Sequence, residues 1–156
     1  MEFSREISVA VPPEKVWAFL WDLDRMARCI PGCREAREIE PHKRYEALVS
    51  ERVGPFKVQF PLDIDIVEAE APSRLRAVAT GRDNSVRSSV RVRLDLDIVG
   101  DAGRTSLSIH ADVSVLGKLA TLGHGVIKRK SDEIMTQFAE SLRQALEDSR
   151  ADAAAL

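Results

Sequence analysis

The sequence contains little cysteine, few aromatic residues, and neither a long apolar run nor a strong excess of one charge. Only Cys29 and Cys33 are cysteines among 156 residues, and aromatic residues make up 5%. The three-residue gap between the two cysteines does not match a thioredoxin-type motif, and no second pair exists to complete a zinc site. We therefore expect free thiols and no bound metal.

Membrane-spanning, secreted and nucleic-acid-binding proteins are also disfavoured. No apolar run approaches the ~20 residues that a spanning helix needs. The N-terminal segment 1–7 contains acidic residues and lacks the apolar core of a signal peptide. A formal net charge of -2 provides no overall positive field for nucleic acid. We predict a cytoplasmic protein with at most peripheral contact at the inner membrane face.

The composition is that of an ordinary globular protein, with 44% hydrophobic and 31% charged residues. A chain of this length fits one domain and can bury roughly 70% of the surface that its unfolded form exposes. The sequence has no internal repeat and no linker. We predict a single domain over residues 1–149 and a short tail over 150–156.

Alternation of apolar and polar residues predicts about seven strands. The segments with this period are 3–11, 36–40, 45–53, 56–70, 75–81, 86–99 and 107–115. The pattern is clearest in the sixth segment, where Val90, Val92 and Leu94 alternate with Arg91 and Arg93. Pro61 lacks an N–H for a ladder hydrogen bond, so we expect it at a sheet edge or in a bulge.

Three helices are predicted around these strands. Helical period follows Pro12-Pro13 over residues 14–20, and Asp24 is expected to cap a second short helix over 25–29. From about 116 to 149, apolar residues recur at intervals of three, four or seven, as in a long amphipathic helix. One helix covers only a stripe of a broad apolar sheet face. The remaining apolar volume is therefore either packed solid or enclosed as a cavity.

The element order and four short segments resemble a known superfamily. The segment VPPEKVWAFL at 11–20 is similar to the START-like (SRPBCC) superfamily, whose fold is the helix-grip. Three more segments resemble the CoxG family of carbon monoxide dehydrogenase subunits, namely CIPGC at 29–33, VGPFK at 53–57, and GKLA at 117–120 with Gly123. The resemblance implies an α+β helix-grip fold. In that fold a curved antiparallel sheet of about seven strands surrounds a long C-terminal helix, and two short helices follow the first strand.

The resemblance also implies a function. It suggests noncatalytic carriage of a quinone- or lipid-like small molecule in an apolar cavity, serving a carbon monoxide dehydrogenase-type molybdenum hydroxylase. Two alternatives stay open, a polyketide cyclase or aromatase-type enzyme and a protein-interaction module on the same fold. An enzyme would bury His124, Thr121 and Arg82 beside one another. We expect no cofactor other than a bound quinone or lipid.

For the binding site we predict apolar residues from the sheet and the last helix, because ligand pockets are lined mainly by apolar side chains. The predicted residues are Phe56, Phe60, Leu62, Leu94, Leu119, Leu122, His124, Val126 and Ile127. The sequence contains no nucleophile elbow, Cys-His arrangement or phosphate-binding loop, and we predict no catalytic residue. His42 is expected to be solvated, and His110 to lie on the outer face of the sheet.

Two features of segment 117–130 each have two interpretations. Gly117, Gly123 and Gly125 each weaken a helix by ~1 kcal/mol relative to alanine. They favour either a helix start that moves as a gate or close packing of the helix backbone on the sheet. The basic triplet 128–130 is either a solvated surface or a contact with anionic lipid headgroups.

Overall fold

The computed structural model describes the backbone of residues 1–155 and the side chains of residues 1–149. The elements are β1 (Glu2–Val9), α1 (Pro13–Leu20), α2 (Leu23–Cys29), β2 (Cys33–Glu40), β3 (Arg44–Val53), β4 (Phe56–Glu70), β5 (Arg74–Asp83), β6 (Ser88–Gly100), β7 (Thr105–Gly117), the 3-10 helix η1 (Lys118–Leu122) and α3 (His124–Ala155). The strands form one antiparallel sheet in the order β1-β7-β6-β5-β4-β3-β2.

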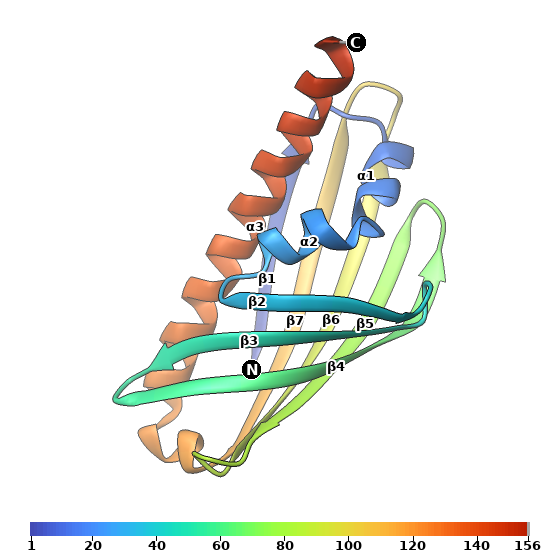
Figure 1. The fold of residues 1–156 in the computed structure, drawn as a ribbon. Helices are drawn as coiled ribbons and strands as arrows, with labels where there is room; N and C mark the ends of the chain where they lie inside the picture. The colour runs from blue at the N-terminus through green and yellow to red at the C-terminus, as the bar shows by residue number, and fades with distance from the viewer. Residues whose placement is uncertain (156) are drawn as a thin grey trace.

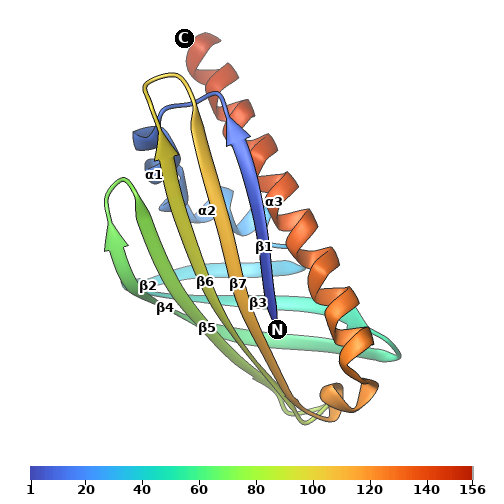
Figure 2. The same ribbon diagram turned by 180° about the vertical axis from the view of Figure 1, so that it is seen from behind.

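The sheet bends strongly, so that β2, β3 and β4 run across the direction of β5, β6 and β7 (Figure 1). Helix α3 runs along the open side of this bend, next to β1. Helix α2 packs against α3, and α1 packs against α2 and β6 (Figures 1 and 2). Both views agree with the curved sheet and long C-terminal helix predicted from the sequence.

Two clusters of buried apolar side chains hold the helices against the sheet. The larger cluster joins α1, α2 and the C-terminal half of α3 to β1, β6 and β7, and it includes Leu142 and Leu146, which are 0% and 1% exposed. The smaller cluster joins β3 and β4 to η1 and the first turn of α3, through Val53, Val58, Phe60, Leu119 and Ile127. Full burial of one such side chain contributes about 1.5–3 kcal/mol, so each cluster anchors one end of α3.

Two helix starts differ from the sequence prediction. Helix α2 begins at Leu23, because Asp22 is the N-cap and its carboxylate accepts a hydrogen bond from the Arg25 N–H at 3.3 Å. The long helix begins at His124, not near residue 116, since β7 continues to Gly117 and η1 forms a separate turn. Gly117 and Gly123 have φ of 93° and 96°, which interrupts helical geometry on both sides of η1. Helix α3 continues to Ala155, and Leu156 lies outside the described residues.

Pro61 lies at a locally unpaired edge of an inner strand, which fits the expected edge position, and β4 has no bulge against β3 there. Strand β4 lies inside the sheet, and its register with β3 passes through the Leu48–Pro61 pair without a shift. The β4–β5 ladder begins only at Leu62, opposite Gly81. Pro61 therefore lies just beyond the point where β4 has a partner in β5.

Candidate hydrophobic binding site

The inner face of the sheet, which faces α3, is apolar across its central strands. The register pairs Ile64 with Ala79, Ala79 with Val92, and Val92 with Val113. Because directly paired residues point to the same face, one apolar row crosses β4, β5, β6 and β7. The alternation of apolar and polar residues predicted from the sequence accounts for this apolar face.

Between the two core clusters, the inner-face side chains are only partly buried. These residues are Ile64, Ile66, Ala77, Ala79, Val90, Val92, Leu94, Val113 and Val115. Further along β6 and β7, Leu96, Ile98 and Ile109 are at most 4% exposed. A packed interior buries the centre of a sheet face almost completely. Protein side chains therefore cover the middle of this face less completely than its ends.

An aromatic contact connects the short helices to the turn between β2 and β3. Trp17 and Trp21 are partly buried, and their rings meet edge to face at 5.7 Å between centroids. Trp21 stacks on His42, with 3.9 Å between ring centroids. His42 is exposed, as predicted, but its ring is also held by this stack and its backbone N–H donates to Tyr45 Oη at 3.0 Å. The indole Nε1–H of Trp21 is buried and has no hydrogen-bond acceptor among the described side chains and backbone.

The nine partly buried inner-face residues between the two clusters carry no ionisable group. Two ionisable side chains of the same face are instead paired with α3: Arg5 with Asp132 at 2.6 Å, and Glu51 with Lys130 at 3.0 Å. A buried charge without a partner costs several kcal/mol. The middle of the face therefore suits an uncharged apolar molecule.

Seven of the nine predicted binding residues come together in the smaller core cluster. They are Phe56, Phe60, Leu62, Leu119, Leu122, Val126 and Ile127. Leu94 packs against the larger cluster instead, and His124 is exposed and belongs to neither. Phe60, Leu119 and Ile127 are at most 8% exposed, so they already pack against protein neighbours. Their part in ligand binding stays a prediction.

Val92, Val113 and the two tryptophans are not among the binding residues predicted from the sequence. The alternation did place the two valines on the apolar face. The part of that face left uncovered depends on where α3 begins, and the sequence placed that start near residue 116 instead of at His124.

The described residues contain no arrangement typical of a catalytic centre. Thr121, His124 and Arg82 are all exposed, and the Arg82 Nε–H donates to Asn84 Oδ1 at 2.8 Å. No group of three or more His, Cys, Asp or Glu side chains in residues 1–149 is placed to hold a metal ion. Cys29 and Cys33 are free thiols, and burial raises the pKa of both. A raised pKa disfavours the reactive thiolate.

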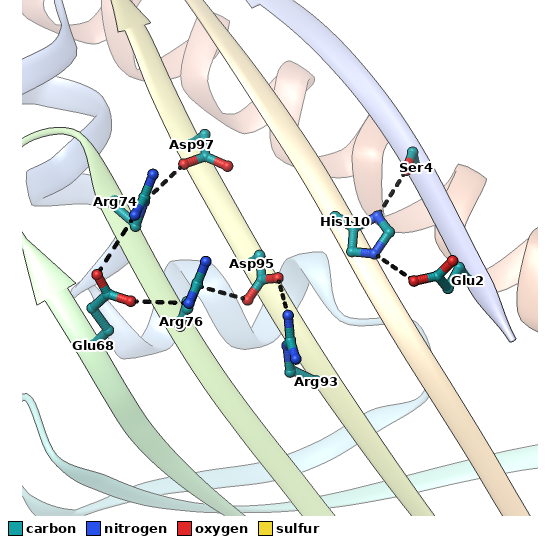
Figure 3. A network of polar contacts seen from close by, with 9 residues as sticks. All are labelled: Glu2, Ser4, Glu68, Arg74, Arg76, Arg93, Asp95, Asp97 and His110. Atoms are coloured by element: carbon teal, nitrogen blue, oxygen red, sulfur yellow. Dashed lines mark hydrogen bonds and ion pairs between the residues drawn. The ribbon is translucent and has the colours of Figure 1, made fainter.

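The outer face of the sheet carries charged side chains in pairs (Figure 3). Asp95 is only 9% exposed and lies between Arg93 and Arg76, at 3.2 and 3.4 Å. Arg74 pairs with Asp97 at 3.2 Å. The carboxylates of β6 are therefore ion-pair partners on the outer face of the sheet. His110 also lies on this face, within 2.9 Å of Ser4 Oγ.

A groove of about 780 Å³ crosses β2, β3, β4 and β5 on the same outer face. The register places the row Ala36, Ala47, Leu62 and Gly81 along its floor, between two rows of outward side chains. Its walls include the ion pair of Arg37 with Glu46 at 2.9 Å. The sheet separates this groove from the apolar inner face.

No helix within the described part of the chain combines the length and apolar character needed to cross a bilayer.

Solved structures with the same fold cover nearly the whole chain. A conserved protein from Geobacillus kaustophilus has a TM-score of 0.83 and 19% identity, covering 96% of this chain and 97% of its own. A START superfamily protein from Mycobacterium smegmatis has a TM-score of 0.67 and 12% identity, covering 94% and 97%. A protein from Rhodobacter sphaeroides has a TM-score of 0.63 and 18% identity, covering 97% and 92%. At these identities the likeness establishes the fold alone, and it confirms the helix-grip arrangement predicted above.

Among curated proteins, none matches the sequence. The model of the CoxG family of carbon monoxide dehydrogenase subunits matches residues 6–147. That match includes at least part of every strand and most of α3, and it contains all the segments on which the resemblance was based. The chain therefore belongs to the CoxG family of carbon monoxide dehydrogenase subunits.

Proposed function

We propose that this protein binds an uncharged hydrophobic small molecule, quinone- or lipid-like, against the inner face of the sheet and carries it without catalysing a reaction. The supporting observation is the partly buried apolar stretch between the two core clusters. Removing apolar surface from water contributes about 25 cal/mol per Å². A guest that covers Val92, Leu94 and Val113 gains this free energy without displacing a packed side chain.

We further propose that the carried molecule serves a carbon monoxide dehydrogenase-type molybdenum hydroxylase. The family description names carbon monoxide dehydrogenase, and a carrier without catalytic groups fits an accessory role beside such an enzyme. The absence of ionisable groups among the nine partly buried residues between the clusters favours a neutral guest over a fatty acid or another anion.

Tryptophan fluorescence tests ligand binding directly. Trp17 and Trp21 are the only two tryptophans of the chain and pack against the larger cluster beside the proposed site. Titration with a short-chain quinone should quench their emission in a saturable way. Val92→Phe fills part of the uncovered stretch and should raise the Kd about tenfold, a loss of about 1.4 kcal/mol.

Val78→Phe is the matched control, because Val78 is also partly buried but faces outward, paired with Asp65 and Arg93. It should leave the Kd unchanged. Equal affinity in all three proteins would contradict binding at the inner face. Absence of saturable quenching, together with no quinone or lipid in an organic extract of the purified protein, would contradict the carrier function itself.

A further inference from the structure

Unpaired cations gather at one end of the molecule. They come from the β3–β4 turn, the β5–β6 turn, η1 and the first turns of α3, and together they form the basic end: Arg52, Lys57, Arg87, Lys118, Lys128 and Arg129. All six side chains are exposed. None forms an ion pair with another described side chain.

Contacts between the four segments bring these cations together. The Lys118 N–H donates to the Arg87 carbonyl at 3.2 Å, and Lys118 Nζ lies 5.4 Å from the centroid of the Phe56 ring. Gly54 in the β3–β4 turn approaches the Leu122 side chain, and Lys130 of α3 pairs with Glu51 of β3. Figures 1 and 2 both place the two turns, η1 and the start of α3 at the same end.

Two cations of the basic end form a cross-strand pair that destabilises the folded protein. Arg52 and Lys57 are directly opposite each other in the β3–β4 ladder. Like charges at directly paired positions destabilise a sheet. The acidic side chains nearby do not relieve this repulsion, since Glu51 is paired with Lys130 and Asp83 is buried and accepts hydrogen bonds from Gln59 and Ser85.

Apolar surface accompanies the cations. Leu116 ends β7 immediately before η1 and is 67% exposed, and Pro55 is exposed at the tip of the β3–β4 turn. Cations around exposed apolar side chains match a bilayer surface, where acidic headgroups attract Lys and Arg and the apolar groups insert among the lipids. We propose that the basic end docks the protein on an anionic lipid surface.

Vesicle sedimentation tests this docking with the unliganded protein, so its outcome is independent of the proposed cargo. The wild type should sediment with phosphatidylcholine vesicles that contain about one-third phosphatidylglycerol, and not with pure phosphatidylcholine. High salt should release it, because exposed charges are screened. The triple variant R52E/K57E/R129E should partition at least about tenfold less strongly.

The matched control is K15E/R28E/R34E, which reverses three exposed, unpaired cations of α1, α2 and β2. Each triple changes the formal charge by the same amount, and circular dichroism confirms that each is folded. Equal loss in both triples would overturn the proposal, since net charge alone would explain the binding. Retention of the wild type on a polyglutamate matrix without any vesicle binding would assign the basic end to an acidic protein and also overturn it.

Discussion

At the scale of single residues, the Arg52–Lys57 pair predicts a trade-off between stability and lipid binding. Arg52→Glu converts a repulsive cross-strand pair into an attractive one, and should raise the free energy of unfolding by about 0.5 kcal/mol. The same change should weaken sedimentation with anionic vesicles. Urea unfolding and sedimentation of one sample measure both effects.

Arg44→Glu, which instead breaks the exposed pair with Asp65 on the same face, should leave vesicle binding unchanged. Lower stability of Arg52→Glu than of the wild type would show that the two cations do not repel each other in the folded protein.

The hydrogen bonds of Asp83 predict how the free energy of unfolding depends on pH. The Ser85 hydroxyl and the Gln59 backbone N–H donate to its carboxylate at 2.6 and 2.8 Å, and these bonds hold the pKa of Asp83 below its usual value. A lowered folded pKa contributes stability that is present above the unfolded value of about 3.9 and is lost as the pH falls through the folded pKa.

Asp83→Asn should therefore reduce the free energy of unfolding by about 1 kcal/mol at pH 7. The difference from the wild type should shrink below about pH 4. Asp63→Asn, at an exposed position of β4 without an ion pair among the described side chains, should have no such effect. Urea unfolding across the acid range measures both variants, and a constant difference between Asp83→Asn and wild type would refute the assignment.

At the scale of elements, the sequence predicted strands better than helix starts. A strand such as β6 alternates over its whole length, because each side chain meets either the core or solvent. The start of α3 was misplaced because segment 116–122 contains Leu116, Leu119 and Leu122 at helical spacing. The positive φ of Gly117 and Gly123 overrides this local pattern. A glycine in the sequence does not by itself indicate the sign of its φ.

Gly117 and Gly125, which lie on either side of η1, should respond differently to alanine. A Cβ on Gly117 would collide with the Arg87 carbonyl, and its φ of 93° is unfavourable for alanine, so Gly117→Ala should cost about 2 kcal/mol or more. A Cβ on Gly125 meets nothing within 4 Å, and Gly125→Ala should stabilise α3 by up to about 1 kcal/mol. Thermal unfolding measures both, and equal melting temperatures would contradict the distinction.

The candidate site was also only partly predictable from local sequence patterns. The apolar face followed from alternation, and its members in β4 and η1 do meet in space. The uncovered stretch around Val92 and Val113 depends on how the bend of the sheet, α1, α2 and α3 share that face. These elements are far apart in the sequence, so the local pattern of residues does not predict how they pack together.

At the scale of the whole molecule, the proposed activities occupy different regions. The two tryptophans and His42 lie where α1 and α2 meet the β2–β3 turn, and the uncovered apolar stretch lies between the two clusters. The basic end lies beyond the smaller cluster. Substitutions can therefore alter cargo binding and surface docking separately. Val92→Phe tests the first, and R52E/K57E/R129E tests the second.

The direction of α3 also affects the charge distribution of the whole molecule. Its 32 residues extend about 48 Å at 1.5 Å per residue, and its N-terminus lies at the basic end. Aligned peptide units place about half a positive charge at that N-terminus. The backbone and the side chains thus polarise the molecule in the same sense, despite a formal net charge of only -2. The field of a negatively charged plane exerts a torque on such a molecule and turns its positive pole forward before the first collision.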